Sequence, residues 1–298
     1  FRTGSNNVLL RRHGAVGEDI FHCSMSPLTC PKSPWSCTIT TLFSLMPDLQ
    51  IEDIHVRFSG VVALNGVSME IREGEIFSLV GPNGSGKTTL FNCVSGFVKP
   101  HHGTIYYGGL DLLSQPPHRI IDAGISRTFQ NLQNVPYMTI LDNVLLGNHS
   151  RIDNRGTVKR WLFRDQRESE EQAALKVLDF LGLANYEQKY LSGQPYGIQK
   201  LVEIARSLVA RPKLVLIDEP AAGMNDQETM EIAKIITEIR DDLDITVLVV
   251  EHDMSLVMSI SDRVCVLDSG NIVTVGIPDE VKEHPDVISA FLGEGAVA

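Results

Sequence analysis

Residues 81–88, GPNGSGKT, bring three glycines, a lysine and a threonine together between two regular segments. The short run IFSLV (76–80) before them predicts a buried strand. A helix should begin at about Lys87, with Leu90, Phe91 and Val94 on one face. A strand, a glycine-rich turn and a helix in this order are typical of a phosphate-binding loop. The segment therefore favours an α/β fold with a ligand at the end of a strand.

The rest of the chain from residue 47 onward continues this alternation. Residues 49–58, 67–71, 214–217 and 245–250 predict strands, and residues 165–182 predict an amphipathic helix. Residues 226–242 predict a further helix, whose inward-facing side chains should be Met230, Ile235, Ile236 and Ile239. Strands that alternate with helices predict a mainly parallel sheet.

The glycine-rich segment has the chemistry that a nucleotide phosphate chain requires. Glycines allow successive backbone N–H groups to curl around an anion, and the helix start adds its positive dipole end. Lys87 should contact the β- and γ-phosphates, while the Thr88 hydroxyl should bind Mg²⁺. The predicted phosphate-binding residues are Gly81, Pro82, Asn83, Gly84, Ser85, Gly86, Lys87, Thr88 and Thr89.

Acidic and imidazole side chains follow the later strands. Asp218 comes at the end of LVLID and should hold Mg²⁺, with Glu219 next to it as the base that activates water. His252 follows the strand 245–250, where an imidazole could contact the γ-phosphate. The expected cofactors are ATP and Mg²⁺.

Composition limits the partners and the compartment. The formal net charge of −11 disfavours general binding to nucleic acid. No apolar run reaches the roughly 18–20 residues that span a bilayer, so we expect a cytoplasmic chain that docks on a membrane protein. Cys93 and Cys265 should lie in the core. Cys23, Cys30 and Cys37 lack C-x-x-C spacing, and we interpret them as incidental.

Residues 1–47 differ from the rest of the chain. They begin with Phe, lack sustained periodicity and are rich in Ser, Pro, Thr and Cys. We expect translation to start naturally at Met46. The preceding segment should be a disordered tail or a start-site artefact, and we assign no function to it.

Taken together, these motifs resemble the ATP-binding subunits of ABC transporters over residues 48–296. The resemblance implies a P-loop NTPase core, an N-terminal antiparallel β portion and an inserted α-helical subdomain at about 131–210. Phe58 resembles the aromatic residue that stacks on adenine. Gln130 resembles the glutamine that binds Mg²⁺, takes part in catalysis and senses the membrane partner. Asn225 stands where the family usually has Asp.

Two consecutive segments compete for the family's signature turn, LSGQ (191–194) and PYGIQ (195–199). Apolar residues from Ile198 onward follow a helical period, and Pro195 suits the first helical position. The free N–H groups should then be those of Tyr196, Gly197 and Ile198. The family's spacing to Asp218 also selects Gly197, so LSGQ is not the signature.

With Gly197 as the signature glycine, the segment departs from the family's LSGGQ sequence. Pro195 replaces the serine and Ile198 replaces the glutamine, which should weaken contact with a partner's γ-phosphate. The resemblance therefore implies a heterodimer with a second ATP-binding subunit.

Further similarity lies in PYGIQK, PAAGMN and the C-terminal GIPDEV. These segments resemble subunits of bacterial importers for branched-chain or hydrophobic amino acids, on the cytoplasmic face of the membrane. Transmembrane permease subunits, contacted through residues 131–145, and indirectly a periplasmic binding protein would be the partners. The alternatives are an ATPase of a lipid or lipopolysaccharide export system and a soluble ABC ATPase of DNA repair or translation.

Overall fold

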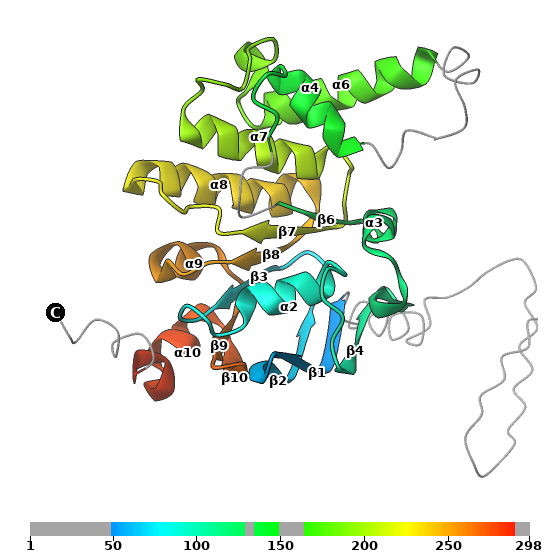
Figure 1. Cartoon of the computed structure of the whole chain (residues 1–298). Helices are drawn as coiled ribbons and strands as arrows, with labels where there is room; N and C mark the ends of the chain where they lie inside the picture. The colour runs from blue at the N-terminus through cyan, green and yellow to red at the C-terminus, as the bar shows by residue number, and fades with distance from the viewer. Residues whose placement is uncertain (1–48, 129–133, 149–163, 290–298) are drawn as a thin grey trace, which may run out of the picture. The chain divides into compact units, whose positions relative to one another are not determined.

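The computed structural model describes residues 49–128, 134–148 and 164–289 (Figure 1). Every described residue belongs to the unit Leu45–Ala298. The predictions for residues 1–47, including the three cysteines, and for Gln130 lie outside the described residues. Among the described helices, none has the length and apolar character needed to cross a membrane.

A six-stranded sheet contains the buried strands that the sequence predicts. Its order is β10-β9-β3-β8-β7-β6, and all neighbours are parallel except β9 and β10. The strands are β3 (Ile76–Val80), β6 (Ile125–Arg127), β7 (Leu214–Asp218), β8 (Thr246–Val250), β9 (Arg263–Asp268) and β10 (Asn271–Gly276). The prediction of a mainly parallel sheet is confirmed.

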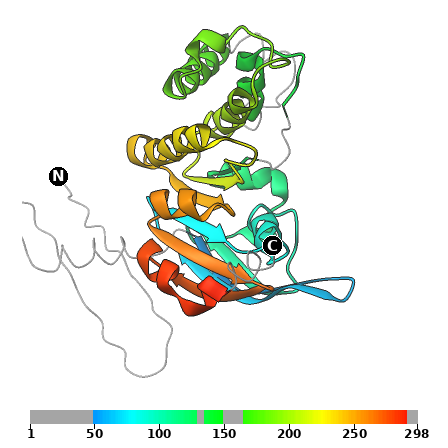
Figure 2. The ribbon, with the colours of Figure 1, turned by 90° about the vertical axis from the view of Figure 1, so that its left-hand side faces the viewer.

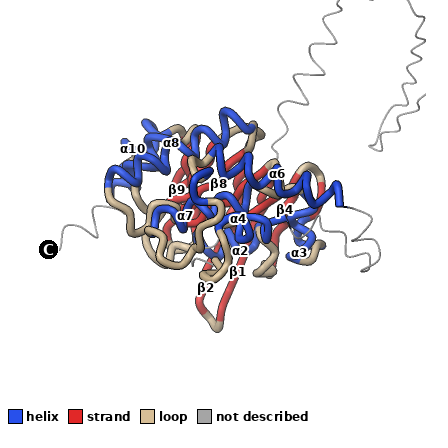
Figure 3. The backbone as a smooth tube through the Cα atoms, turned by 90° about the horizontal axis from the view of Figure 1, so that it is seen from above, coloured by secondary structure: helices blue, strands red, loops and turns tan. Residues whose placement is uncertain are grey.

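The N-terminal strands form a separate antiparallel sheet in the order β2-β1-β4-β5. Its strands are β1 (Leu49–Phe58), β2 (Val61–Ile71), β4 (His102–Tyr107) and β5 (Leu110–Asp111). β2 is longer than the predicted strand 67–71, because it continues through the hairpin with β1. The turn of this hairpin projects beyond the neighbouring strands in both Figure 2 and Figure 3.

Helices alternate with the strands along the chain. They are α2 (Lys87–Val94), α3 (Pro117–Ile120), α4 (Ile140–Leu145), α6 (Arg164–Phe180), α7 (Tyr196–Leu208), α8 (Asp226–Leu243), α9 (Met254–Ile260) and α10 (Pro278–Glu283). Short 3₁₀ turns cover η1 (Leu112–Ser114), η2 (Ile121–Ala123), η3 (Leu146–Asn148) and η4 (Ala184–Tyr186). α4, α6 and α7 lie between β6 and β7 in the chain, although these two strands are neighbours in the sheet. They form the predicted helical insertion, at the top of Figure 1.

The central strands are buried on both faces, which explains their continuous apolar sequence. In β7, Leu214 and Leu216 face a core shared with α2 and the antiparallel sheet, which also contains the buried Cys93 and Cys265. Val215 and Ile217 face the opposite core, shared with α4, α6, α7 and α8. The sheet therefore separates two hydrophobic layers.

One side chain in α8 contradicts the sequence prediction. Met230 is 73% exposed, whereas Ile232, Ile236 and Ile239 are buried. At 3.6 residues per turn, Met230 lies about 200° around the helix from Ile232 and so points to solvent. The predicted inward position of Met230 is wrong, and Ile232 occupies the core in its place.

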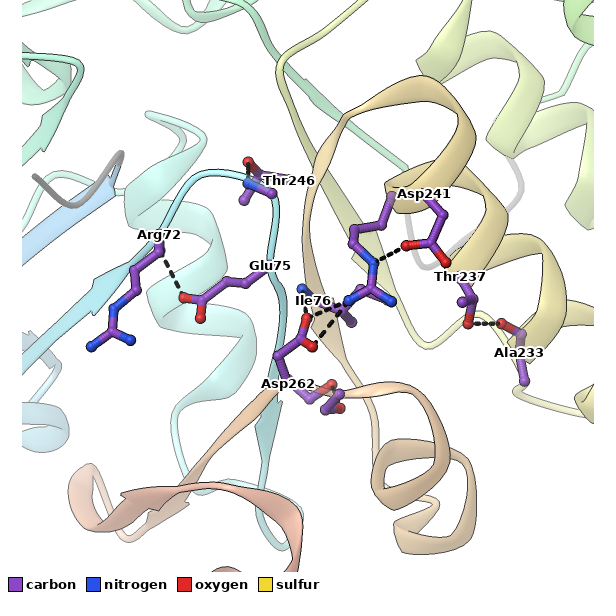
Figure 4. Close-up of polar contacts among 12 residues, drawn as sticks. Arg72, Glu75, Ile76, Ala233, Thr237, Asp241, Thr246 and Asp262 are labelled. Atoms are coloured by element: carbon purple, nitrogen blue, oxygen red, sulfur yellow. Dashed lines mark hydrogen bonds and ion pairs between the residues drawn. The ribbon is translucent and has the colours of Figure 1, made fainter. Parts of the chain in front are cut away.

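Polar contacts tie the loops together at the amino ends of the parallel strands (Figure 4). The Asp262 carboxylate accepts the Ile76 N–H at 2.8 Å and pairs with Arg240 at 2.7 Å. The Glu75 carboxylate accepts the Arg72 N–H at 2.7 Å. Ligands of open α/β sheets bind at the opposite end, where the strands have their carboxyl ends. This network therefore stabilises the end of the sheet that lies opposite the predicted site.

Candidate functional site

The carboxyl ends of three adjacent strands meet at one level. Leu79 of β3 pairs with Val250 of β8, which pairs in turn with Asp218 of β7. The glycine-rich loop follows the first strand, His252 follows the second and Glu219 follows the third. Residues that are far apart in the chain are therefore brought to the same edge of the sheet, as the sequence predicts for a nucleotide site.

The glycine-rich loop depends on close backbone contacts. A Cβ at Gly81 would lie 2.0 Å from the Leu267 carbonyl oxygen, and one at Gly86 would lie 2.6 Å from that of Ala63. Gly86 also has φ 106° and forms the N-cap of α2. These contacts fix the loop between β2 and β9, and they exclude any larger residue at either position.

Lys87 lies inside this loop rather than on the surface. Its ammonium group donates to the carbonyl oxygens of Gly81 at 2.6 Å and of Pro82 at 2.9 Å, and only 6% of the residue is exposed. Asn83, Gly84 and Thr88 are exposed around it, while Pro82 and Thr89 are half-buried. The Ser85 hydroxyl is buried and has no hydrogen-bond partner among the described residues. A polar group left in this state is available to a ligand.

Asp218 is a buried carboxylate with one oxygen paired and one available. Its Oδ2 accepts from Arg127 Nη2 at 3.1 Å, and its Oδ1 has no hydrogen-bond partner among the described residues. Burial raises the pKa of Asp218 above its ordinary value, against the opposing charge of Arg127. The same burial lowers the pKa of Arg127, and Asp218 opposes that shift. Both charges are thus held in place at a cost in desolvation.

Arg127 connects Asp218 to α2. Its Nη1 donates to Asn92 Oδ1 at 2.7 Å and to Ser95 Oγ at 3.1 Å, and its guanidinium lies 4.7 Å from the centre of the Phe91 ring. The side chain is 11% exposed. Arg127 therefore fixes the rotamer of the predicted Mg²⁺ ligand, although no sequence motif singled it out.

Replacing Arg127 by methionine should destabilise the protein by about 3–5 kcal/mol, because it leaves Asp218 as an uncompensated buried charge. Urea unfolding without nucleotide measures this loss. Arg119→Met, at an exposed arginine in α3, is the matched control and should change stability by less than about 0.5 kcal/mol. Equal effects of the two substitutions would contradict the role given to the Arg127–Asp218 pair.

Glu219 has an unusual backbone conformation for its residue type, with φ 44°. Its N–H donates to the Val250 carbonyl at 2.9 Å, and its own carbonyl accepts from Lys200 Nζ at 3.5 Å. Non-glycine residues in this region cost of order 1–3 kcal/mol and concentrate at functional sites. Contacts to β8 and α7 therefore hold the backbone of the half-buried Glu219 at the strand end.

His252 is exposed, and the buried Glu251 beside it organises the neighbouring loops. One Glu251 oxygen accepts the Ala221 N–H at 3.0 Å, and the other accepts the His252 N–H at 2.8 Å. The His252 ring nitrogen Nδ1 lies 3.4 Å from the same carboxylate. Glu251 thus connects the loop after β7 to the loop after β8. The sequence analysis missed it, although an acidic residue at the end of an apolar strand is a visible signal.

The start of α7 differs by one residue from the prediction. The first helical residue is Tyr196, and Pro195 is the N-cap with an extended ψ of 152° rather than the first helical residue. The Gln199 N–H is the first to bond within the helix, to the Pro195 carbonyl. The N–H groups of Tyr196, Gly197 and Ile198 therefore belong to the first turn and have no carbonyl partner within the helix, as predicted. Gly193 lies before the helix with φ 83°.

Two further side chains lie at helix starts, Tyr196 in the first turn of α7 and Asn225 at the N-cap of α8. Burial raises the pKa of the Tyr196 hydroxyl, and the charges of Glu203 and Glu219 raise it further. Asn225 accepts the N–H groups of Gln227 and Glu228 and so caps α8 in a capping box. Asparagine performs this cap as well as the aspartate that is usual there.

Phe58 ends β1 and pairs with Val61 across the hairpin turn, where it is 49% exposed. An exposed aromatic ring at this position is compatible with stacking on a base. The structure brings the glycine-rich loop, Asp218, Glu219 and His252 to one end of the sheet. The roles of these residues and of Phe58, Tyr196 and Gly197 stay predictions.

Comparison with known proteins gives a consistent result. Residues 64–222 match the ABC transporter family. The high-affinity branched-chain amino acid transport ATP-binding protein LivG of Salmonella typhimurium is 41% identical over 251 residues, 83% of this chain and 98% of that protein. BraF of Pseudomonas aeruginosa, which carries the same description, is 39% identical over 252 residues, again 83% and 98%. A crystal structure of an ATP-binding cassette of an ABC transporter in its ADP conformation aligns with a TM-score of 0.74 at 31% identity, covering 83% of this chain and 99% of that one. The resemblance found in the motifs is confirmed, and the chain belongs to the ABC transporter family as a relative of its ATP-binding subunits.

Proposed function

We propose that this chain binds and hydrolyses ATP to power an importer of branched-chain or other hydrophobic amino acids. The observation that carries the proposal is the meeting of the glycine-rich loop, Asp218, Glu219 and His252 at one edge of the sheet. The names of the relatives LivG and BraF supply the solute class.

The residues of the loop bind and orient the phosphates. Backbone N–H groups of residues 83–88 surround the β-phosphate, and the Lys87 ammonium leaves its carbonyl partners to contact the γ-phosphate. Phe58 stacks on the adenine ring. Glu219 accepts a proton from the attacking water, and His252 contacts the γ-phosphate from the neighbouring strand end.

The predicted Mg²⁺ ligands fit a cation that is held partly through water. Asp218 Oδ1 is buried and lacks a protein partner among the described residues, and the Thr88 hydroxyl is exposed in the first turn of α2. Gln130 completes the proposed set. When bound, Mg²⁺ neutralises charge that develops on the phosphate oxygens.

A surface next to α4 supports the proposed permease contact. Several apolar side chains are exposed here: Val135, Tyr137, Met138 and Leu146. Tyr137 is 85% exposed, and exposed apolar side chains that gather on one surface are typical of protein interaction sites. We infer that this surface docks on a transmembrane subunit at the cytoplasmic face of the membrane. A periplasmic binding protein would deliver the solute to that permease.

The signature segment supports pairing with a second, different ATP-binding subunit. The N–H groups of Tyr196 and Gly197 face a partner's γ-phosphate in the proposed dimer, while Pro195 and Ile198 contribute no side-chain donor. We further propose that the ATPase domain spans residues 48–296, with the helical subdomain at about 131–210 and residues 1–47 as a separate extension.

Uptake measurements test the proposed transport function. Cells that lack this gene should lose uptake of labelled leucine, isoleucine and valine, and the wild-type gene should restore it. Lys87→Ala should not, because the substitution removes the charge that contacts the phosphates. The wild-type protein should also copurify with two permease subunits. Unchanged amino-acid uptake together with a defect in lipid export would favour the lipid-export alternative and overturn the proposal.

A further inference from the structure

A second group of polar side chains lies on the antiparallel sheet, separate from the predicted nucleotide site. Asp53 and His55 of β1 and His102 of β4 each present one metal-binding atom, and these three atoms lie within 4.8 Å of one another. Asp53 Oδ1 is 2.9 Å from His55 Nε2, and Asp53 Oδ2 is 3.0 Å from His102 Nδ1. The three residues line an open hollow together with Arg57 and His101. We call them the Asp53 cluster.

A β-bulge in β1 brings the three side chains together. Glu52 pairs with Thr104 and His55 pairs with His102, so β1 has one residue more than β4 between these pairs. Asp53 has φ 51° in the bulge, and its N–H donates to Ser68 Oγ at 2.9 Å. Gly103 faces the bulge, where an added Cβ would lie 2.4 Å from the Asp53 carbonyl oxygen. The backbone itself therefore positions the carboxylate between the two imidazoles.

The donor set selects a class of cation. Two imidazole nitrogens and one carboxylate oxygen suit Zn²⁺ and its transition-metal neighbours, whereas Mg²⁺ and Ca²⁺ prefer oxygen ligands. Donors bonded at about 2.0–2.2 Å to one tetrahedral Zn²⁺ lie roughly 3.3 Å apart. The three donor atoms lie within 4.8 Å of one another, so small side-chain movements would bring them around one ion. The side chains of Asp53 and His102 are 56% and 71% exposed, so an ion can enter and keep a water ligand.

We propose that Asp53, His55 and His102 form a binding site for a divalent transition metal of the Zn²⁺ class, which links β1 to β4. Metal binding replaces the two hydrogen bonds that the imidazoles now make to Asp53. Arg57 lines the same hollow, and its positive charge opposes the cation. Removing the Arg57 charge should therefore tighten binding of the metal, which gives an independent test.

The test titrates the full nucleotide-free chain with Zn²⁺ after its accessible thiols are blocked. Bound metal is counted by equilibrium dialysis, and the melting temperature is followed in parallel. Asp53→Asn removes the carboxylate but tolerates the positive φ, and His102→Gln removes one imidazole. His118→Gln, at an exposed histidine in α3, is the matched control.

The wild type and His118→Gln should each bind one more Zn²⁺ per chain than Asp53→Asn or His102→Gln. Zn²⁺ should also raise the melting temperatures of the wild type and His118→Gln by several degrees more than those of Asp53→Asn and His102→Gln, because it binds only the folded sheet. Arg57→Gln should bind the same number of ions with a lower Kd. Equal stoichiometry and equal melting shifts in the wild type, Asp53→Asn and His102→Gln would overturn the proposal and leave the three residues as a hydrogen-bonded cluster.

Discussion

Replacing Glu219 by glutamine should leave ATP binding intact and lower the hydrolysis rate by about 10²–10⁴-fold, because glutamine cannot accept the proton of the attacking water. Glutamine has the size of glutamate and is no worse suited to φ 44°, so the strand end should keep its conformation. Single-turnover hydrolysis with the partner subunits present, beside a nucleotide-binding titration, measures both quantities.

Lys87→Ala is the matched comparison, because its main effect should be on binding. The Lys87 ammonium is held by the loop carbonyls and is directed into the phosphate cradle. Its removal should raise the Kd for ATP, whereas Glu219→Gln should not. Wild-type turnover in the Glu219→Gln protein would exclude Glu219 as the base.

The strands that carry the site were predictable because burial on both faces produces a continuous apolar run. β3 agrees with the predicted residues, and β7 and β8 agree to within one residue. β6 is only three residues long, and its position at the sheet edge depends on pairing with β7, so no local signal indicates it. Met230 shows a different limit, since an apolar residue in an amphipathic helix does not by itself identify the buried face.

The polar organisation of the site was less predictable than its motifs. Arg127 and Asp218 are 91 residues apart, and only the parallel pairing of β6 with β7 brings them together. The Asp53 cluster depends in the same way on the pairing of β1 with β4 and on an extra residue in one strand. Sequence motifs identified the residues that would touch phosphate, whereas the residues that orient them required the fold.

Gly197→Asp should abolish ATP-driven dimer closure while leaving binding to this chain's own glycine-rich loop nearly unchanged. Gly197 lies in the first turn of α7, and within the part of the chain that the structure describes a Cβ there would meet only Glu228 Oε1, at 3.6 Å. An acidic residue in a first helical turn is favoured by the helix dipole, so the subunit should fold normally. In the closed dimer, however, the new carboxylate would face a partner's γ-phosphate. Nucleotide binding, ATP-dependent dimerisation and turnover are the three measurements.

Two controls are needed. One separates the effect of the added charge from that of the added volume, and the other tests which glycine faces the phosphate. Gly197→Asn adds similar volume without the charge and should impair closure less than Gly197→Asp. Gly193 lies outside the helix, and an added Cβ there would have no described atom within 4 Å. Aspartate is among the residues that tolerate the positive φ of this position. Gly193→Asp should therefore change closure little. Loss of closure in Gly193→Asp with normal closure in Gly197→Asp would mean that the LSGQ turn faces the phosphate.

The carboxylate of Glu251 has a consequence for exchanging parts between related proteins. Because it holds the Ala221 N–H with one oxygen and the His252 N–H with the other, the loops after β7 and β8 share a single anchor. A chimera that takes one of these loops from another ATPase inherits only half of that arrangement. We therefore expect a chimera to keep the arrangement of these two loops better when both loops and residue 251 are exchanged together.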